Sequence, residues 1–151
     1  MGPGCRVAPS FYCLDPTKLS LGRNVSIGFN VRLHTFAPMT IGDWTLIASD
    51  ASAANGWHET RDLKPNAGEL QVGRGVWVGM GAKLVGALTI GDYAIVGAGS
   101  VVVNDVAPGE IVAGSPARAI GQRDLADRQW NFRSWWDTAT FEPLPTGGQR
   151  E

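Results

Sequence analysis

Residues 72–106 read VGRGVWVGMGAKLVGALTIGDYAIVGAGSVVVNDV, and this stretch decides the fold because one six-residue pattern repeats through it. Aliphatic residues recur at every sixth position: Val72, Val78, Leu84, Ile90, Val96 and Val102. A small or branched residue follows each of them four positions later, and glycine directly follows most of them. Self-similarity at such a short fixed period indicates a repeat architecture, and this hexad is typical of a parallel β-helix.

The same pattern occurs earlier in the chain, at Leu21, Ile27, Leu33, Ile41 and Ile47, with a shift of two residues before Ile41. The shift falls within residues 36–40, where we expect a bulged corner. Three hexads make one triangular coil of about 18 residues, whose aliphatic side chains stack on those of the next coil. Because one coil cannot bury its own interior, several must stack, and the pattern predicts about four coils. We assign them to a domain spanning residues 1–121.

Two segments lie outside this pattern. Residues 55–70 are polar and contain Gly and Pro, so they are predicted to form a loop extruded from one corner of the coil. Residues 122–151 form a tail that is rich in tryptophan and arginine. We expect a short helix or an extended segment there, which either covers the open end of the stack or packs on a neighbouring subunit.

Length and composition narrow the classes of function. A chain of 151 residues with 44% hydrophobic residues is expected to form a single domain with a packed core. A net charge of -1 gives no basis for binding nucleic acid. No apolar run is long enough for a membrane-spanning helix or a signal segment, so we predict a cytoplasmic protein without membrane insertion. Cys5 and Cys13 lack the spacing of a zinc site, and we expect free thiols.

Four motifs carry a resemblance to a known family: Gly75–Gly79 (GVWVG), Ile90–Asp92 (IGD), Val96–Val102 (VGAGSVV) and Val112–Arg118 (VAGSPAR). Together with the histidine in the extruded loop, they make residues 20–121 similar to the hexapeptide-repeat acyltransferases. The chain most resembles the maltose, galactoside and nodulation-factor O-acetyltransferases and the colanic-acid-type polysaccharide acetyltransferases.

This resemblance implies an all-β, left-handed parallel β-helix that assembles as a homotrimer with active sites at the subunit interfaces. It implies transfer of an acetyl group from acetyl-CoA to a carbohydrate hydroxyl, with no metal requirement and with a single catalytic histidine in the loop that leaves the coil. His58 occupies that position. The family often has Gly-His there, whereas this chain has Gly56-Trp57-His58.

The residues themselves also favour His58 as a catalytic base. Acyl transfer from a thioester needs a base that accepts the proton of the hydroxyl near neutral pH, and histidine has a suitable pKa. His58 lies in the one long segment that breaks the repeat, and loops on a rigid scaffold often hold catalytic residues. Either a nearby carboxylate or a backbone carbonyl is expected to hold its other ring nitrogen. His34, next to an inward position, is interpreted as a surface residue at a corner.

Asn30 is a second candidate, because the resemblance places an asparagine that contacts the acceptor at this position. An amide can donate to and accept from a sugar hydroxyl, but a corner asparagine that adopts a left-handed backbone conformation is an equally simple interpretation.

The resemblance assigns the acetyl-CoA site to Trp77, Gly79, Met80, Gly97, Ala98, Arg118 and Arg123. The backbone N–H groups near Met80 are expected to stabilise the oxyanion, and the glycine-rich corners to line the pantetheine arm. Trp77 is either a wall of that channel or an ordinary packing residue on a face of the coil. Arg118, assisted by Arg123, is expected near the adenosine phosphates.

Other functions fit the same fold. An N-acetyltransferase acting on an amino sugar, or a streptogramin-type enzyme that inactivates an antibiotic, would use the same site. A zinc hydratase of the γ-carbonic-anhydrase type needs about three ligands, and neither of the two histidines lies in a ligand pattern. A non-catalytic scaffold is a further alternative, which the loop histidine and the Ala-Gly-Ser-Pro-Ala-Arg motif oppose.

Overall fold

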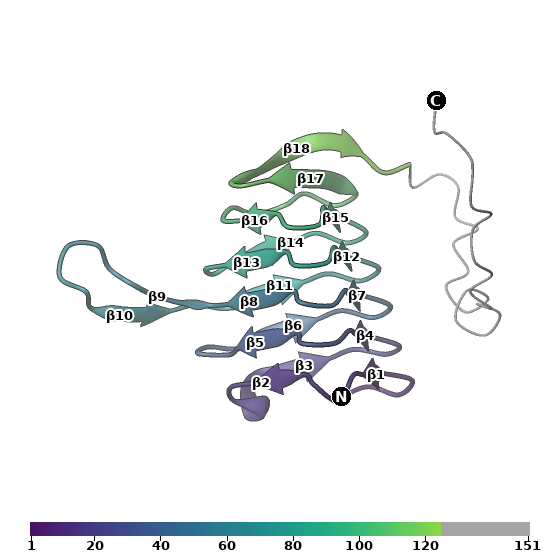
Figure 1. The fold of residues 1–151 in the computed structure, drawn as a ribbon, viewed down its shortest axis with the longest axis horizontal. Helices are drawn as coiled ribbons and strands as arrows, with labels where there is room; N and C mark the ends of the chain where they lie inside the picture. The colour runs from purple at the N-terminus through teal and green to yellow at the C-terminus, as the bar shows by residue number, and fades with distance from the viewer. Residues whose placement is uncertain (125–151) are drawn as a thin grey trace.

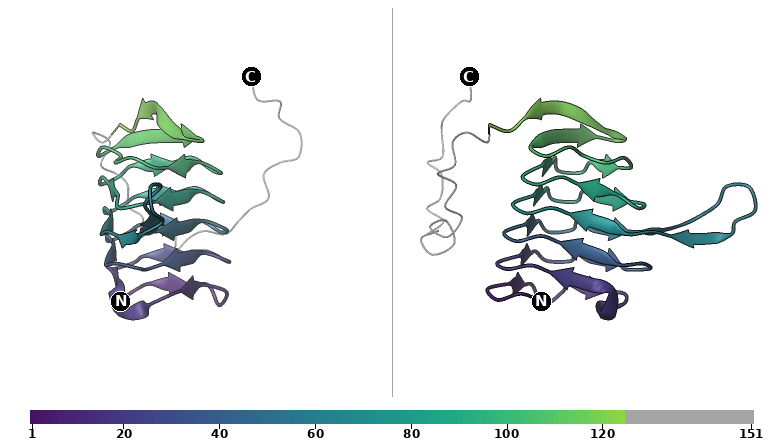
Figure 2. Two further views of the ribbon diagram at one scale, coloured as in Figure 1. Left: turned by 90° about the vertical axis from the view of Figure 1, so that its left-hand side faces the viewer. Right: turned by 180° about the vertical axis from the view of Figure 1, so that it is seen from behind.

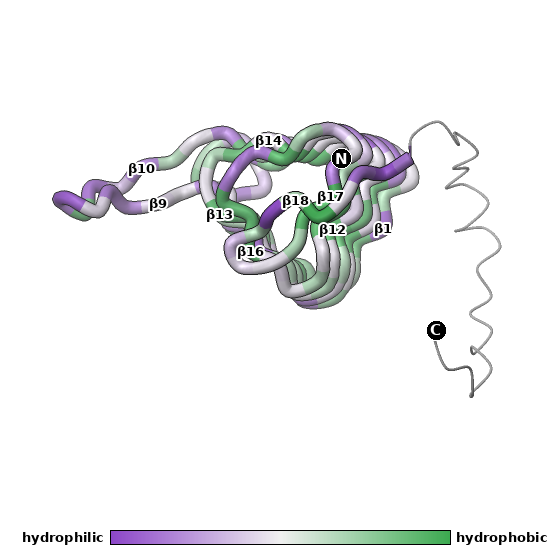
Figure 3. The backbone as a smooth tube through the Cα atoms, turned by 90° about the horizontal axis from the view of Figure 1, so that it is seen from above, coloured by the Kyte–Doolittle hydropathy of each residue, from purple (hydrophilic) through white to green (hydrophobic). Residues whose placement is uncertain are grey.

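The chain folds as a parallel β-helix with three flat faces. The computed structural model describes residues 1–124, and the tail predicted for residues 122–151 lies outside this range from residue 125 onward. Figure 1 shows the coils stacked one above another, and Figure 2 shows the same stack from the side and from behind. Seen down the stack in Figure 3, the coils superpose into a triangular outline. Within residues 1–124, no helix is long and apolar enough to cross a membrane.

Each face is a sheet of short strands taken from successive coils. The first face contains β1 (Arg6–Val7), β4 (Ser26–Ile27), β7 (Leu46–Ile47), β12 (Trp77–Val78), β15 (Ile95–Val96), β17 (Glu110–Gly114) and β18 (Ala117–Gln122). The second face contains β2 (Tyr12–Cys13), β5 (Arg32–His34), β8 (Ser52–Ala54), β13 (Lys83–Val85) and β16 (Val101–Val102). The third face contains β3 (Leu19–Leu21), β6 (Met39–Ile41), β11 (Leu70–Val72) and β14 (Thr89–Ile90).

Strands within each face pair in parallel and in register, for example Val78 with Ile47 below it and with Val96 above it. At the top of the stack, β18 turns back and pairs antiparallel with β17. A short 3-10 helix, η1 (Pro16–Lys18), lies between β2 and β3 at the bottom. We call the edges of the prism the first corner (between the first and second faces), the second corner (between the second and third faces) and the third corner (between the third and first faces).

The interior confirms the parallel β-helix predicted from the hexads. All six aliphatic residues of the deciding stretch are buried, and so are the small residues four positions after them: Val76, Ala82, Leu88, Ala94, Ser100 and Val106. The hexads counted from Leu21 did not include β1 and β2, which precede Leu21 and complete the lowest coil together with β3. This coil forms the lower end of the stack, and only part of its apolar surface, including Cys5, Phe11 and Leu19, packs against the core.

The Ile-Gly-Asp motif has a structural explanation at the third corner. The Asp43 carboxylate accepts a hydrogen bond from the backbone N–H of Arg23 in the coil below, at 2.8 Å. Asp92 accepts the Arg74 N–H at 2.9 Å in the same way. The Arg23 backbone N–H, and then its guanidinium, lower the pKa of Asp43 because both favour the ionised carboxylate. Glycine precedes each aspartate because adjacent coils approach too closely for a side chain; a Cβ atom at Gly42 would lie 2.6 Å from the Arg74 nitrogen.

The segment predicted as an extruded loop leaves the second corner, and it is an ordered arm. β9 (Gly56–His58) and β10 (Pro65–Ala67) pair antiparallel, with His58 opposite Pro65 and Gly56 opposite Ala67. Figures 1 and 3 show this arm projecting well beyond the coil between β8 and β11. The extrusion was therefore predicted correctly, whereas the polar sequence gave no indication of the strand pairing within the arm.

We predict that Gly42→Ala lowers the free energy of unfolding by about 3 kcal/mol, because the new methyl group overlaps the backbone of the next coil. Gly81→Ala is the matched control. Its Cβ atom would meet nothing within 4 Å, and only the positive φ of 68° opposes the substitution. We expect a loss of about 1 kcal/mol for this control. Urea denaturation at one protein concentration measures both values, and equal losses would contradict the close-approach explanation.

Candidate active site

The root of the arm is fixed by a buried asparagine. Asn55 is fully buried, and its side-chain oxygen accepts the backbone N–H groups of Phe36 at 2.9 Å and Ala37 at 3.2 Å. Its side-chain nitrogen donates to the carbonyls of Ala37 at 2.9 Å and Pro38 at 3.1 Å. The Asn55 carbonyl also accepts the Gly68 N–H, where the second strand of the arm returns. The Asn55 side chain therefore fixes the corner at residues 36–38, where the hexad shifts. This corner lies next to the root of the arm.

Within the arm, Glu59 links the two strands instead of contacting the histidine. Its carboxylate accepts the Trp57 indole N–H at 3.3 Å and the Asn66 side-chain amide at 3.0 Å. Its backbone N–H donates to the Lys64 carbonyl at 2.9 Å, which closes the tip. These bonds give the arm a defined shape even though most of its residues are exposed.

The ring of His58 is held by a backbone carbonyl. Its Nδ1 lies 2.8 Å from the carbonyl oxygen of Leu63, and the ring is exposed. A carbonyl oxygen accepts hydrogen bonds and does not donate them, so Nδ1 carries the proton and the neutral ring has its lone pair on Nε2. Leu63 adopts a left-handed backbone conformation with φ of 57°, which is uncommon for a leucine. The sequence left two kinds of partner for this ring nitrogen, a carboxylate and a backbone carbonyl, and the structure shows the carbonyl.

Five of the residues assigned to acetyl-CoA lie along or directly above the first corner. Gly79 and Met80 lie one coil below Gly97 and Ala98, and the Gly99 N–H donates to the Met80 carbonyl between them. Arg118, on β18, pairs with Ala113, and Ala113 lies over Gly97, because a Cβ atom at Gly97 would be 3.0 Å from the Ala113 side chain. Met80 is 60% exposed, and among residues 1–124 its N–H has no hydrogen-bond acceptor. The corner thus presents a free backbone donor and a cation along one exposed edge.

Asn30 shares the first corner but lies two coils below Met80. Its backbone is left-handed with φ of 56°, and its side-chain nitrogen donates to Asp50 at 3.2 Å. In this chain it is a corner residue, and it lies on a different corner from the arm that carries His58. Trp77 points outward from the first face and is 50% exposed, so it is not an internal packing residue.

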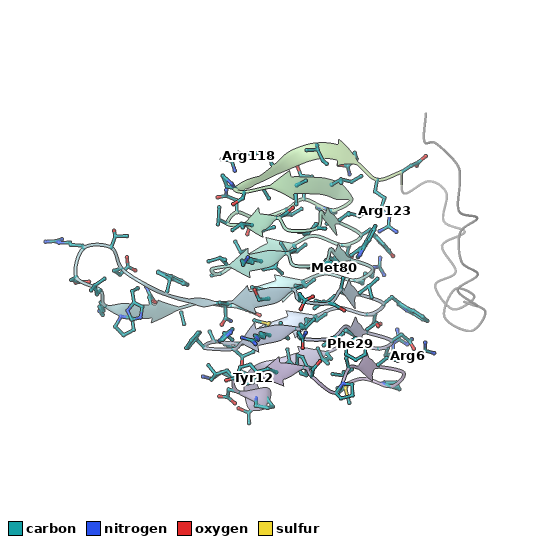
Figure 4. All side chains as sticks on the ribbon, viewed as in Figure 1. Arg6, Tyr12, Phe29, Met80, Arg118 and Arg123 are labelled. Carbon is teal, nitrogen blue, oxygen red and sulfur yellow. The ribbon has the colours of Figure 1, made fainter. Side chains whose placement is uncertain are left out.

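Arg123 lies away from the other cofactor-assigned residues. Its guanidinium donates to the carbonyl oxygens of Gly75 at 3.2 Å and Tyr93 at 3.1 Å, at the third corner. Partial burial lowers the pKa of Arg123, because a charged group is less stable away from water. Figure 4 shows Arg118 and Arg123 on opposite sides of the top of the stack. The structure therefore does not bring these two arginines together.

One protomer also separates His58 from the first corner. The arm leaves the second corner at Asn55, and the second face lies between it and the first corner at Asp50. Five residues of extended chain span about 16 Å, and the arm then points away from the coil. A reaction that uses both His58 and the edge formed by Gly79, Met80, Gly97 and Ala98 therefore needs a second copy of the chain.

Sequence reasoning missed two residues that build this site. Leu63 carried no signal, because its contribution is a backbone carbonyl that any residue type has. Asn55 carried a weak signal: it directly follows the last regular strand before the arm, where its amide can satisfy four backbone groups at once. In residues 1–124, no group of three His, Cys, Asp or Glu side chains is arranged to hold a metal ion.

Comparison with known proteins agrees with this architecture. A family model described as bacterial transferase hexapeptide (six repeats) matches residues 70–104. Nodulation protein L of Rhizobium meliloti (strain 1021) is 39% identical over 126 residues, which cover 80% of this chain and 69% of that protein. Galactoside O-acetyltransferase of Escherichia coli (strain K12) is 29% identical over 140 residues, which cover 89% of this chain and 69% of that protein.

A solved structure shows the same fold. The hexapeptide-repeat-containing acetyltransferase of Vibrio cholerae O1 biovar eltor, complexed with acetyl-CoA, matches with a TM-score of 0.78 and 29% sequence identity. The match covers 81% of this chain and 69% of that chain. Together these similarities define the class of protein as an acyltransferase built on a β-helix. The chain belongs to the hexapeptide-repeat acetyltransferase family, which confirms the predicted family and enzyme class.

We predict effects of different size on stability for the two arginines. Arg123→Ala is expected to lower the free energy of unfolding by about 1–3 kcal/mol, because it leaves the Gly75 and Tyr93 carbonyls without their donor. Arg118→Ala is expected to change it by less than about 0.5 kcal/mol, because Arg118 is exposed and within residues 1–124 its guanidinium bonds only the adjacent Ala117 carbonyl. Chemical denaturation of both variants measures this difference, and a larger loss for Arg118→Ala would contradict the assignment.

Proposed function

We propose that this chain transfers the acetyl group of acetyl-CoA to a hydroxyl of a sugar, and that His58 is the general base. The observation that carries this proposal is the bond from His58 Nδ1 to the Leu63 carbonyl, because it leaves Nε2 free to accept a proton. The similarity to a galactoside O-acetyltransferase supports a sugar acceptor. The related acetyltransferase complexed with acetyl-CoA supports acetyl-CoA as co-substrate.

In this proposal His58 Nε2 removes the proton from the acceptor hydroxyl as the oxygen attacks the thioester carbonyl. The Met80 N–H donates to the oxyanion that develops on that carbonyl. When the carbon–sulfur bond breaks, His58 returns its proton to the sulfur, so CoA leaves as a thiol and the base is restored. The acetyl group passes directly between the two bound substrates without an acyl-enzyme.

We further propose that the active site forms between subunits of a homotrimer. One protomer places His58 and the first corner too far apart, so the arm of one subunit must reach the first corner of its neighbour. Asn30 and Trp77 would then line the same interface, on the subunit that provides Met80.

Free thiols at Cys5 and Cys13 are consistent with a reducing, cytoplasmic environment.

We predict that His58→Gln lowers kcat by about 10²- to 10⁴-fold, because it removes the base but keeps a side chain of similar size. Thiol release from acetyl-CoA in the presence of a panel of sugars measures the rate. Calorimetric titration of the variant with acetyl-CoA is the control, and we expect binding like that of the wild type. Full activity of the variant would contradict the role of His58. Transfer to amino sugars but not to their hydroxyl analogues would identify an N-acetyltransferase instead.

We also predict that two impaired variants complement each other. A His58→Gln subunit keeps an intact first corner, and an Arg118→Ala subunit keeps an intact arm. Subunits of the two kinds can therefore form an intact site only if each site combines the arm of one subunit with the first corner of another. Random mixing by co-refolding should restore about a quarter of the wild-type sites. The assay uses limiting acetyl-CoA, at which Arg118→Ala alone is weakly active. No recovery in mixed assemblies would show that each subunit uses its own His58 and Arg118.

A further inference from the structure

Three aromatic rings form a row on the side of the coil from which the arm leaves. The rings of Tyr12 and His34 have centroids 5.8 Å apart and are tilted by 55°. The rings of His34 and Phe36 have centroids 6.4 Å apart and are nearly parallel, at 17°. Figure 4 shows Tyr12 in the lowest coil, on the side of the stack that carries the arm. We call these three residues the aromatic row.

The aromatic row ends against the first residue of the arm. A Cβ atom at Gly56 would lie 2.6 Å from a ring carbon of Phe36, so the phenyl ring covers that face of Gly56. Alternate residues of a strand point to the same face, so His58 points to the face that Phe36 covers, about 7 Å further along the strand. A group that rests on the Phe36 ring therefore lies on the face to which His58 points, and a sugar ring is large enough to extend from Phe36 toward His58.

The aromatic row is exposed and bordered by polar groups. Phe36 is 49% exposed and Tyr12 is 45% exposed. The Lys18 ammonium donates to the Phe36 carbonyl at 2.9 Å and lies 3.5 Å from the Asp15 carboxylate. A pyranose ring matches such a surface, because one of its faces presents C–H groups to an aromatic ring while its hydroxyls reach polar neighbours.

We propose that Phe36, continued by His34 and Tyr12, is the surface on which the acceptor sugar stacks, and that this stacking directs one hydroxyl to His58. The inference rests on the proposed function and adds the recognition element that the sugar contacts. A sugar is a better occupant than a second copy of the chain, because a protein surface packed on Phe36 would close the approach to His58 from this face. Phe36 is thus a specificity-determining residue, and it selects acceptors with an apolar ring face.

The test compares Phe36→Leu, which keeps an apolar side chain but removes the ring, with Phe36→Tyr, which keeps the ring. Acceptors are methyl glycosides of galactose and glucose, maltose, and glycerol as a hydroxyl acceptor without a ring face. Phe36→Leu should raise KM for the pyranosides by about fivefold to tenfold, with kcat and the KM for acetyl-CoA retained. Phe36→Tyr should restore the pyranoside KM to near the wild-type value, and neither variant should change KM for glycerol.

Three other results would overturn the inference in distinguishable ways. If Phe36→Leu raises KM equally for pyranosides and glycerol, or lowers kcat for all of them, Phe36 only supports the arm. If Phe36→Leu alters the oligomeric state in sedimentation, the aromatic row is an interface between subunits. If the wild type binds acetyl-CoA but transfers to no pyranoside, the proposed sugar acceptor itself is wrong, and the stacking surface is wrong with it.

Discussion

The structure depends on the requirement that every coil stack directly on the next one, at the spacing of paired strands. No coil encloses a core alone, so the interior exists only where aliphatic residues of successive coils are in register. This close stacking excludes side chains at positions such as Gly42, where the backbone of the next coil occupies the space. Each corner therefore becomes a fixed column of residues. The exposed edge formed by Gly79, Met80, Gly97 and Ala98 follows from the fold without a dedicated loop.

The arm interrupts this stacking at one corner, and buried polar contacts compensate for the interruption. Where the hexad shifts, the Asn55 side chain makes four hydrogen bonds, to the N–H groups of Phe36 and Ala37 and to the carbonyls of Ala37 and Pro38. No buried side-chain nitrogen or oxygen in residues 1–124 lacks a partner. The base of the arm is therefore as well defined as the coil. The role proposed for His58 requires this, because a general base works only at a fixed distance from its substrate.

The hexads predicted the interior almost residue by residue, because a buried position in a repeat restricts the side chain at that position. They did not predict the first coil, because its interior lies at an open end where aliphatic side chains are not required. The resemblance assigned both Arg118 and Arg123 to one site. Arg118 lies above the first corner, whereas Arg123 bonds two carbonyls at the third corner. A backbone carbonyl was one of the two partners expected for His58, but which carbonyl could not be predicted, since this depends on how the arm folds and not on the identity of residue 63.

The spacing of Gly56, Trp57 and His58 connects the arm to the aromatic row. In a strand, a glycine directly before a histidine has its open side on the opposite face from the imidazole. Trp57 stands between them, so Gly56 and His58 lie on the same face, and the Trp57 indole lies on the other face, toward Gly68. Phe36 covers Gly56, so its ring lies on the face to which His58 points. Strand parity thus determines which face His58 presents, and in the proposed reaction acceptor preference depends on this parity as well as on residue type.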